Sequence, residues 1–136
     1  MMSLRSPLGR VRGLGSAKEG VQYWWAQRVT ALALLPLVLW FMVSLLSLQH
    51  AEYAAVVDWI GRPFNSALLI LLLISLFYHA ILGLQVVIED YVHTEAVKMS
   101  ALIIMRFVLI LLAVIAIISV VRIAFKAVLL STGAGD

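Results

Sequence analysis

The sequence predicts an all-α membrane protein with three transmembrane helices and a cytoplasmic N-terminus. Of its 136 residues, 64% are apolar and 12% are charged, whereas soluble domains contain roughly 45–50% apolar and about 25% charged residues. Three long apolar runs alternate with short polar segments. A soluble domain of this size buries only part of its chain, so most of these side chains must lie in lipid. The lack of cysteine excludes disulfides and thiolate metal sites.

The first predicted span covers residues 29–48, twenty residues without a charge. A helix of about 20 residues crosses a hydrocarbon core about 30 Å thick. Trp24 and Trp25 precede it, in the position of interfacial aromatic anchors. Residues 1–28 form a basic lead-in to this span. Pro36 lies inside the span, where neighbouring helices tolerate a modest kink.

The other two predicted spans cover residues 66–88 and 101–121, which are twenty-three and twenty-one residues long. Each run is about twice the length of a membrane β-strand, and this favours helices over a barrel. Residues 50–65 and 89–100 are predicted to be polar connections, the first of them with a turn at Gly61–Pro63. The chain therefore reads as one membrane-anchor domain without a second unit.

Lys and Arg residues set the predicted orientation. A cytoplasmic N-terminus places seven of the ten inside and three outside, which agrees with the positive-inside rule. We therefore expect a multi-pass protein of the bacterial cytoplasmic (inner) membrane. Residues 1–20 are rich in arginine and poor in acids, which also fits a transit peptide. The mitochondrial inner membrane is the alternative location.

His79 lies deep inside the second span, where a polar side chain is costly and needs a reason. Neutral imidazole is the commonest metal ligand and binds haem iron axially. Ser75 and Gly83 stand four residues before and after it, so one helix face reads small, histidine, small and could admit a flat macrocycle. The alternative is an interhelical hydrogen bond on a closely packed helix face.

Asp90 follows His79 by eleven residues, close to three helical turns, which predicts one shared face and a separation of about 16 Å. Tyr91 comes next, at the predicted cytoplasmic end. A tyrosine hydroxyl beside a carboxylate suits a lipid-soluble carbonyl ligand such as a quinone. The pair could also be a plain interfacial anchor. A bis-histidine haem would need a second ligand from elsewhere, because His50 and His93 fall in the connections.

The run from His79 to Val92 resembles the second helix of the succinate dehydrogenase hydrophobic membrane anchor subunits, the cytochrome b small-subunit family. That family shows a histidine, a glycine four residues later and an Asp-Tyr pair eleven and twelve residues later, matched here by Gly83, Asp90 and Tyr91. The segment Arg28–Ala31 also resembles the Arg-x-Thr-Ala start of the family's first helix.

The resemblance implies a subunit of respiratory complex II that is not catalytic on its own. In that complex of the respiratory chain and tricarboxylic acid cycle, a flavoprotein subunit oxidises succinate and an iron–sulfur subunit passes electrons to ubiquinone. By position, His79 would be an axial ligand of haem b, shared with a second small membrane cytochrome b subunit. Tyr91 would bond a quinone carbonyl and Asp90 would support it. Arg28 would lie near the haem or quinone, or only snorkel at the interface.

Two other functions compete with this interpretation. One is a fumarate reductase anchor, which runs the reaction in the opposite direction. The other is a cofactor-free membrane scaffold in which His79 only bonds a neighbouring helix. Motifs of soluble enzymes, such as a phosphate loop or a nucleophile elbow, are not found in the sequence. One intramembrane histidine also makes a poor ion path.

Overall fold

The computed structural model describes residues 17–133, and within this range it contains four α-helices. They are α2 (Ala17–Leu48), α3 (Tyr53–Gly61), α4 (Pro63–Tyr91) and α5 (Glu95–Gly133). By length and composition, α2, α4 and α5 can each cross a membrane. The predicted all-α fold with three spans is therefore confirmed. The side of the membrane on which the N-terminus lies stays a prediction.

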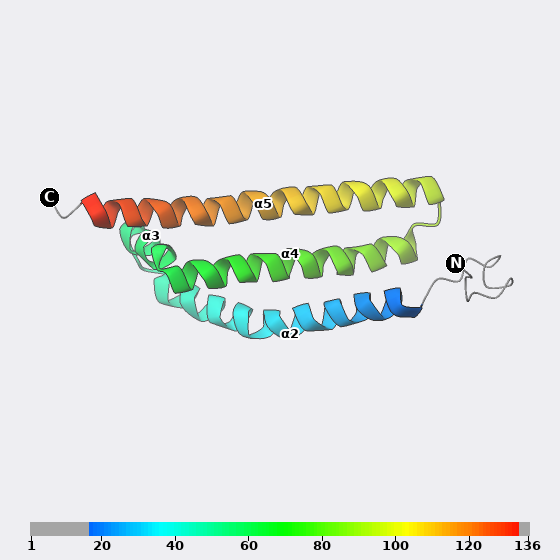
Figure 1. The fold of residues 1–136 in the computed structure, drawn as a ribbon, viewed down its shortest axis with the longest axis horizontal. Coiled ribbons are helices and arrows are strands. Elements are labelled where there is room, and N and C mark those ends of the chain that lie inside the picture. The colour runs from blue at the N-terminus through cyan, green and yellow to red at the C-terminus, as the bar shows by residue number, and fades with distance from the viewer. Residues whose placement is uncertain (1–16, 134–136) are drawn as a thin grey trace, which may run out of the picture.

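The three long helices form a single layer with α4 in the middle (Figure 1). Helix α4 packs against α2 on one side and α5 on the other, and α3 packs against α5. Few side chains are enclosed by such a layer. The buried apolar side chains of the described residues are Leu37, Val57, Leu69, Leu72 and Leu82. Both broad faces of the layer therefore present apolar side chains outward, as lipid or a neighbouring membrane subunit requires.

The helices extend beyond the predicted spans. Helix α5 covers 95–133 instead of 101–121, and at about 1.5 Å per residue its 39 residues extend about 58 Å. Apolar runs mark only the part of a helix in hydrocarbon. The backbone continues as a helix into the headgroup region, where charged side chains are tolerated. For the same reason the predicted connection 89–100 is reduced to residues 92–94 between α4 and α5.

The basic lead-in, residues 1–28, is divided by the start of α2. Residues 1–16 lie outside the described residues, and 17–28 are the first part of α2. That helix continues through Pro36 to Leu48 and is bowed in Figure 1. A proline inside a helix removes one backbone hydrogen bond, and this is a known cause of bending.

The prediction of a simple connection over residues 50–65 was wrong. Helix α3 occupies Tyr53–Gly61, and only Arg62 separates it from Pro63, the first residue of α4. Proline is favoured at the first helical position because its missing N–H would have had no intrahelical acceptor there. Tertiary contacts hold the short α3: Trp59 stacks on Trp40 of α2, with ring centroids 5.6 Å apart.

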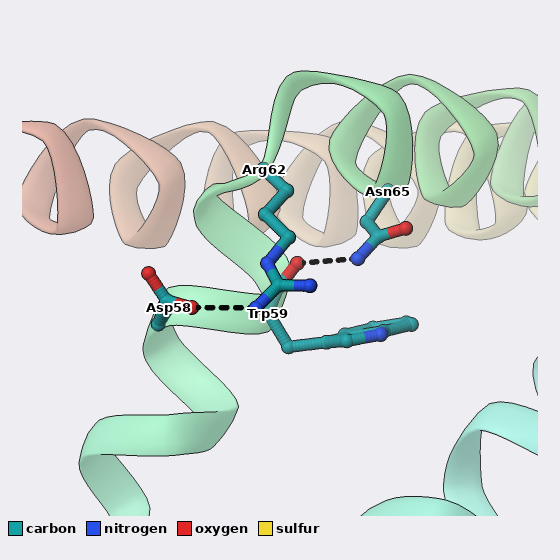
Figure 2. Close-up of polar contacts among 4 residues, drawn as sticks. All are labelled: Asp58, Trp59, Arg62 and Asn65. Carbon is teal, nitrogen blue, oxygen red and sulfur yellow. Dashed lines mark hydrogen bonds and ion pairs between the residues drawn. The ribbon is translucent and has the colours of Figure 1, made fainter.

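Polar contacts fix the bend between α3 and α4, which we call the α3 corner (residues 53–66; Figure 2). The buried amide of Asn65 donates to the Trp59 carbonyl at 2.8 Å, and the Ser66 hydroxyl donates to the Ile60 carbonyl. The first of these bonds supplies a partner for a polar group that would be costly to bury alone. Both hold the start of α4 against the last turn of α3.

Gly61 sets how closely the α3 corner approaches α5. A Cβ atom at this position would collide with the Cβ of Ala127. Both Cβ atoms are bonded directly to the backbone, so no side-chain rotation could relieve the collision. The glycine is therefore required by the close packing of two helices, as small residues are at membrane helix interfaces.

Candidate functional site

His79 of α4 contacts α2 through a hydrogen bond to Thr30. Its Nδ1 lies 3.1 Å from the Thr30 Oγ1, and both side chains are partly buried. The hydroxyl of Thr30 also lies 2.8 Å from the carbonyl oxygen of Ala26 and 3.0 Å from that of Gln27. A hydroxyl in a helix often bonds back to these carbonyls, three and four residues earlier. His79 therefore contacts a hydroxyl whose position is fixed by backbone carbonyls of α2, the helix of Thr30.

A groove of about 520 Å³ opens beside this contact. We call it the His79 groove, and its lining residues are Trp24, Gln27, Arg28, Ala31, Leu32 and His79. Five of these residues belong to α2, and His79 alone comes from α4. The groove combines an imidazole, a guanidinium and apolar surface, with no Asp or Glu among the lining residues. A ligand with a flat apolar body, a metal centre and anionic groups matches this chemistry.

Arg28 is held in the groove wall by an aromatic ring. Its guanidinium carbon lies 4.5 Å from the centroid of the Trp24 ring, within the range of a cation–π interaction. Trp24 in turn meets Trp25 edge to face at 5.3 Å. The expectation that these tryptophans are interfacial anchors fits their exposure. Trp24 additionally shapes the groove, a role that sequence reasoning did not give it.

Ser75 and Gly83, predicted to flank the histidine with little bulk, have different surroundings. Ser75 is buried, with 7% of its surface exposed. A Cβ added at Gly83 would meet nothing within 4 Å among the described residues. Gly83 therefore borders open space, while Ser75 is enclosed by helix packing, and the use of this space by a macrocycle stays a prediction.

Asp90 and Tyr91 lie at the C-terminal end of α4, and both are exposed. Tyr91 is 77% exposed, and its carbonyl accepts a hydrogen bond from His93 Nδ1 at 3.1 Å. The structure places these residues on the helix of His79 and at the end of the layer where α2 begins (Figure 1). No hydrogen bond joins the Asp90 and Tyr91 side chains within residues 17–133, and their predicted cooperation stays a prediction.

The remaining histidines lie outside the long helices. His50 follows α2 and His93 follows α4, and both are exposed. Among residues 17–133, no group of three or more His, Cys, Asp or Glu side chains could hold a metal ion. The described residues therefore do not form a metal site around His79 on their own.

Sequence comparison identifies the family. A model of the family described as "Succinate dehydrogenase/Fumarate reductase transmembrane subunit" matches residues 2–128. The chain belongs to this family. The three long helices that can cross a membrane agree with the description of this family as a transmembrane subunit.

Curated relatives narrow the identification to anchor subunits. The chain is 33% identical to the succinate dehydrogenase hydrophobic membrane anchor subunit of Rickettsia bellii, over 85% of this chain and 93% of the relative. The subunit of the same name from Paracoccus denitrificans is 35% identical over 63% of this chain and 67% of the relative. That of Rickettsia felis is 36% identical over 65% and 73%. These findings support a membrane anchor subunit of succinate dehydrogenase, part of an oxidoreductase complex.

Two linked side-chain hydrogen bonds, which sequence reasoning missed, join α4 and α5 through Arg106, Gln85 and Glu89. Arg106 Nη2 donates to Gln85 Oε1 at 2.7 Å, and Gln85 Nε2 donates to Glu89 Oε1 at 2.8 Å. Gln85 and Arg106 each lie alone among apolar residues in their own runs. Their pairing was hidden because twenty-one residues separate them in sequence. The bond from Arg106 to Gln85 connects α5 to α4, near the end of α4 where Asp90 and Tyr91 lie.

Proposed function

We propose that this anchor subunit contributes one axial ligand of haem b, through His79, to a succinate dehydrogenase complex. We further propose that it forms part of the ubiquinone-reduction site and docks the iron–sulfur and flavoprotein subunits at the membrane. The observation that carries the proposal is that His79 lines a groove together with Arg28. Haem b, when bound, would supply a one-electron carrier inside the membrane.

The residues of the groove suit a haem. The imidazole of His79 is an axial iron ligand by type, and the groove beside it is lined by Trp24, Ala31 and Leu32, which suit an apolar ring. Arg28 can pair with carboxylates such as haem propionates, in which two N–H groups meet two oxygens. Gly83 leaves space on the next turn of α4.

A second subunit completes the proposed haem site. His79 is the only histidine within the long helices of residues 17–133, so a second axial histidine must come from another membrane chain. The single-layer fold leaves both broad faces of the layer uncovered by this chain (Figure 1), so a second chain could pack there and reach the groove. The partner we propose is a second small cytochrome b subunit with one intramembrane histidine.

Tyr91 and Asp90 are the proposed quinone residues. The Tyr91 hydroxyl would donate a hydrogen bond to a quinone carbonyl, and Asp90 would orient that hydroxyl or supply protons. Their exposure at the end of α4 leaves both free to meet a ligand held between this chain and the iron–sulfur subunit. With the N-terminus in the cytoplasm, this end of the layer faces the side on which the soluble subunits would dock. The bacterial relatives fit the inner membrane.

A structural histidine is the second candidate, because the bond between His79 and Thr30 by itself joins two helices. On that interpretation the chain is a cofactor-free anchor. The two candidates differ at Nε2 of His79, which has no hydrogen bond to any other described residue. His79 is only partly buried, and no buried side-chain nitrogen or oxygen of the described residues lacks a partner, so Nε2 is accessible from the groove. An accessible ring nitrogen left without a partner in lipid would be costly, and this favours the haem. A fumarate reductase anchor differs only in reaction direction, and the names of the relatives favour succinate dehydrogenase.

The absorption spectrum of the complex tests the proposal. The complex, purified through its flavoprotein, should show the Soret and α bands of a low-spin b-type haem. In His79→Ala the bands should shift, lose low-spin character or vanish. The helix should still insert, because alanine is apolar and a good helix former. An unaltered low-spin spectrum in an assembled variant would exclude His79 as an axial ligand and leave the interhelical bond as its role.

A further inference from the structure

We propose that Thr30 is a positioning residue that fixes the tautomer of His79. In this arrangement Nδ1 carries the proton and donates it to the Thr30 hydroxyl, so Nε2 keeps its lone pair for the groove. The inference rests on the proposed haem ligation by His79. It assigns a role to a residue of the first span that acts through the histidine and does not itself touch iron.

The argument begins with a count of hydrogens. The Thr30 hydroxyl has one hydrogen, and three polar atoms surround its oxygen: the carbonyl oxygens of Ala26 and Gln27, at 2.8 and 3.0 Å, and His79 Nδ1, at 3.1 Å. Carbonyl oxygens can only accept hydrogen bonds. If Thr30 shares its hydrogen between the two carbonyls in a three-centre bond, Nδ1 must be the donor in the third contact, and every contact is then favourable.

The opposite tautomer satisfies fewer groups. If Thr30 donated to Nδ1, its oxygen lone pairs would face two carbonyl oxygens at hydrogen-bonding distance with no hydrogen between them. The proton of the imidazole would then sit on Nε2, where it blocks coordination of a metal. In the apolar interior such unmatched polar contacts are more costly than in water. The geometry around Thr30 therefore selects the ligand-competent form of His79 before any haem binds.

The same bond controls the strength of the ligand. Histidine ligands commonly donate their second ring N–H to an oxygen, which fixes the ring and raises the basicity of the metal-bound nitrogen. A more basic nitrogen stabilises ferric iron relative to ferrous iron and so lowers the midpoint potential. The carbonyls of α2 hold the Thr30 oxygen in place, so the ring cannot turn about its axis without breaking the bond.

The test uses the intact complex with Thr30→Val, which has nearly the same shape and lacks the hydroxyl. Loss of such a supporting bond typically costs 10–100-fold in metal affinity. A tenfold loss borne mainly by ferric haem would raise the midpoint potential by about 59 mV for a one-electron couple. Thr30→Ser keeps the hydroxyl and should stay near the wild-type potential. Optical redox titration and the low-temperature electron paramagnetic resonance of ferric haem are the readouts.

Ser44→Ala is the matched control, because Ser44 lies on the same helix and its hydroxyl bonds only the Trp40 carbonyl. Its potential should be unchanged. If Thr30→Val does not assemble, Thr30→Ala gives the same comparison with a smaller side chain. Equal potentials in the hydroxyl-free and wild-type complexes would overturn the role of Thr30. If His79→Ala also leaves the haem unaltered, the proposed ligation fails; if only His79→Ala changes it, the tautomer inference alone fails.

Discussion

The α3 corner and the His79 groove are both built from polar and aromatic side chains, but they differ in where their contacts lead. At the corner, Asn65 and Trp59 find partners within the chain (Figure 2). At the groove, Arg28 contacts Trp24 and His79 contacts Thr30, and both side chains still line an open groove. The fold of this chain explains the corner without help from another molecule. The groove stays open in this chain, and the proposed ligand and second subunit would fill it, so matched changes at the two ends should have different consequences.

The largest contrast is expected between two glycines changed to leucine. Gly61→Leu forces bulk against Ala127, and overpacking of this kind typically costs 1–3 kcal/mol, sometimes more. The amount of assembled complex should fall sharply, and its thermal stability should fall with it. Helix α3 packs against α5, so the added side chain would force apart an established contact between the two helices.

Gly83→Leu is the matched change at the other end. A side chain at this position meets nothing within 4 Å in the described chain, so the subunit should still insert and its own helices should still pack. The haem-to-flavin ratio of the purified complex should fall, because the leucine occupies space proposed for the macrocycle. A normal haem ratio in Gly83→Leu would show that this space is not used by haem.

Sequence reasoning could predict the features that depend on hydropathy and on spacing within one helix. The three spans followed from apolar runs, and His79, Gly83, Asp90 and Tyr91 followed from their spacing on one helix. Helix α3 could not be predicted in this way, since its nine residues include Asp58 and end in glycine. What makes it helical is packing on α5 and the stack of Trp59 on Trp40.

The contact between Thr30 and His79 was also beyond sequence reasoning, since forty-nine residues separate the two positions. Periodicity within one helix contains no information on which residue of another helix lies opposite. The Arg-x-Thr-Ala segment drew attention to this part of α2, but it gave no role to the hydroxyl. The pairing of Arg106 with Gln85 was missed for the same physical reason.

A second contrast, of intermediate size, compares two tyrosines. Tyr91→Phe removes only the hydroxyl proposed to bond a quinone carbonyl, which typically costs about 1–3 kcal/mol and would slow quinone reduction by roughly 5- to 150-fold. Succinate oxidation by a soluble artificial acceptor should be nearly unchanged. Steady-state rates with both acceptors measure the difference.

Tyr53→Phe is its control at the α3 corner. The Tyr53 hydroxyl accepts a hydrogen bond from Lys126 at 3.3 Å in an exposed position. Its loss should change neither rate. If Tyr91→Phe lowered both activities equally, Tyr91 would support assembly and its proposed role at the quinone site would be wrong.

The smallest effect, and the most direct test of the central claim, compares two arginines by optical redox titration of the haem. Arg28→Gln removes a positive charge from the groove. Ferric haem is the more positive form, so it becomes easier to stabilise and the midpoint potential should fall. The expected shift is on the order of tens of millivolts, since about 1.4 kcal/mol corresponds to about 59 mV for one electron.

Arg62→Gln removes the same charge at the other end, where Arg62 pairs with Asp58 at 3.1 Å and both side chains are mostly exposed. Such surface pairs contribute about 0–1 kcal/mol. Arg62 is the N-cap of α4, seventeen residues before His79 and so about 25 Å away along the helix. The account predicts a lower haem potential in Arg28→Gln and an unchanged potential in Arg62→Gln. Equal shifts in both variants, or no shift in Arg28→Gln, would contradict a haem in the His79 groove.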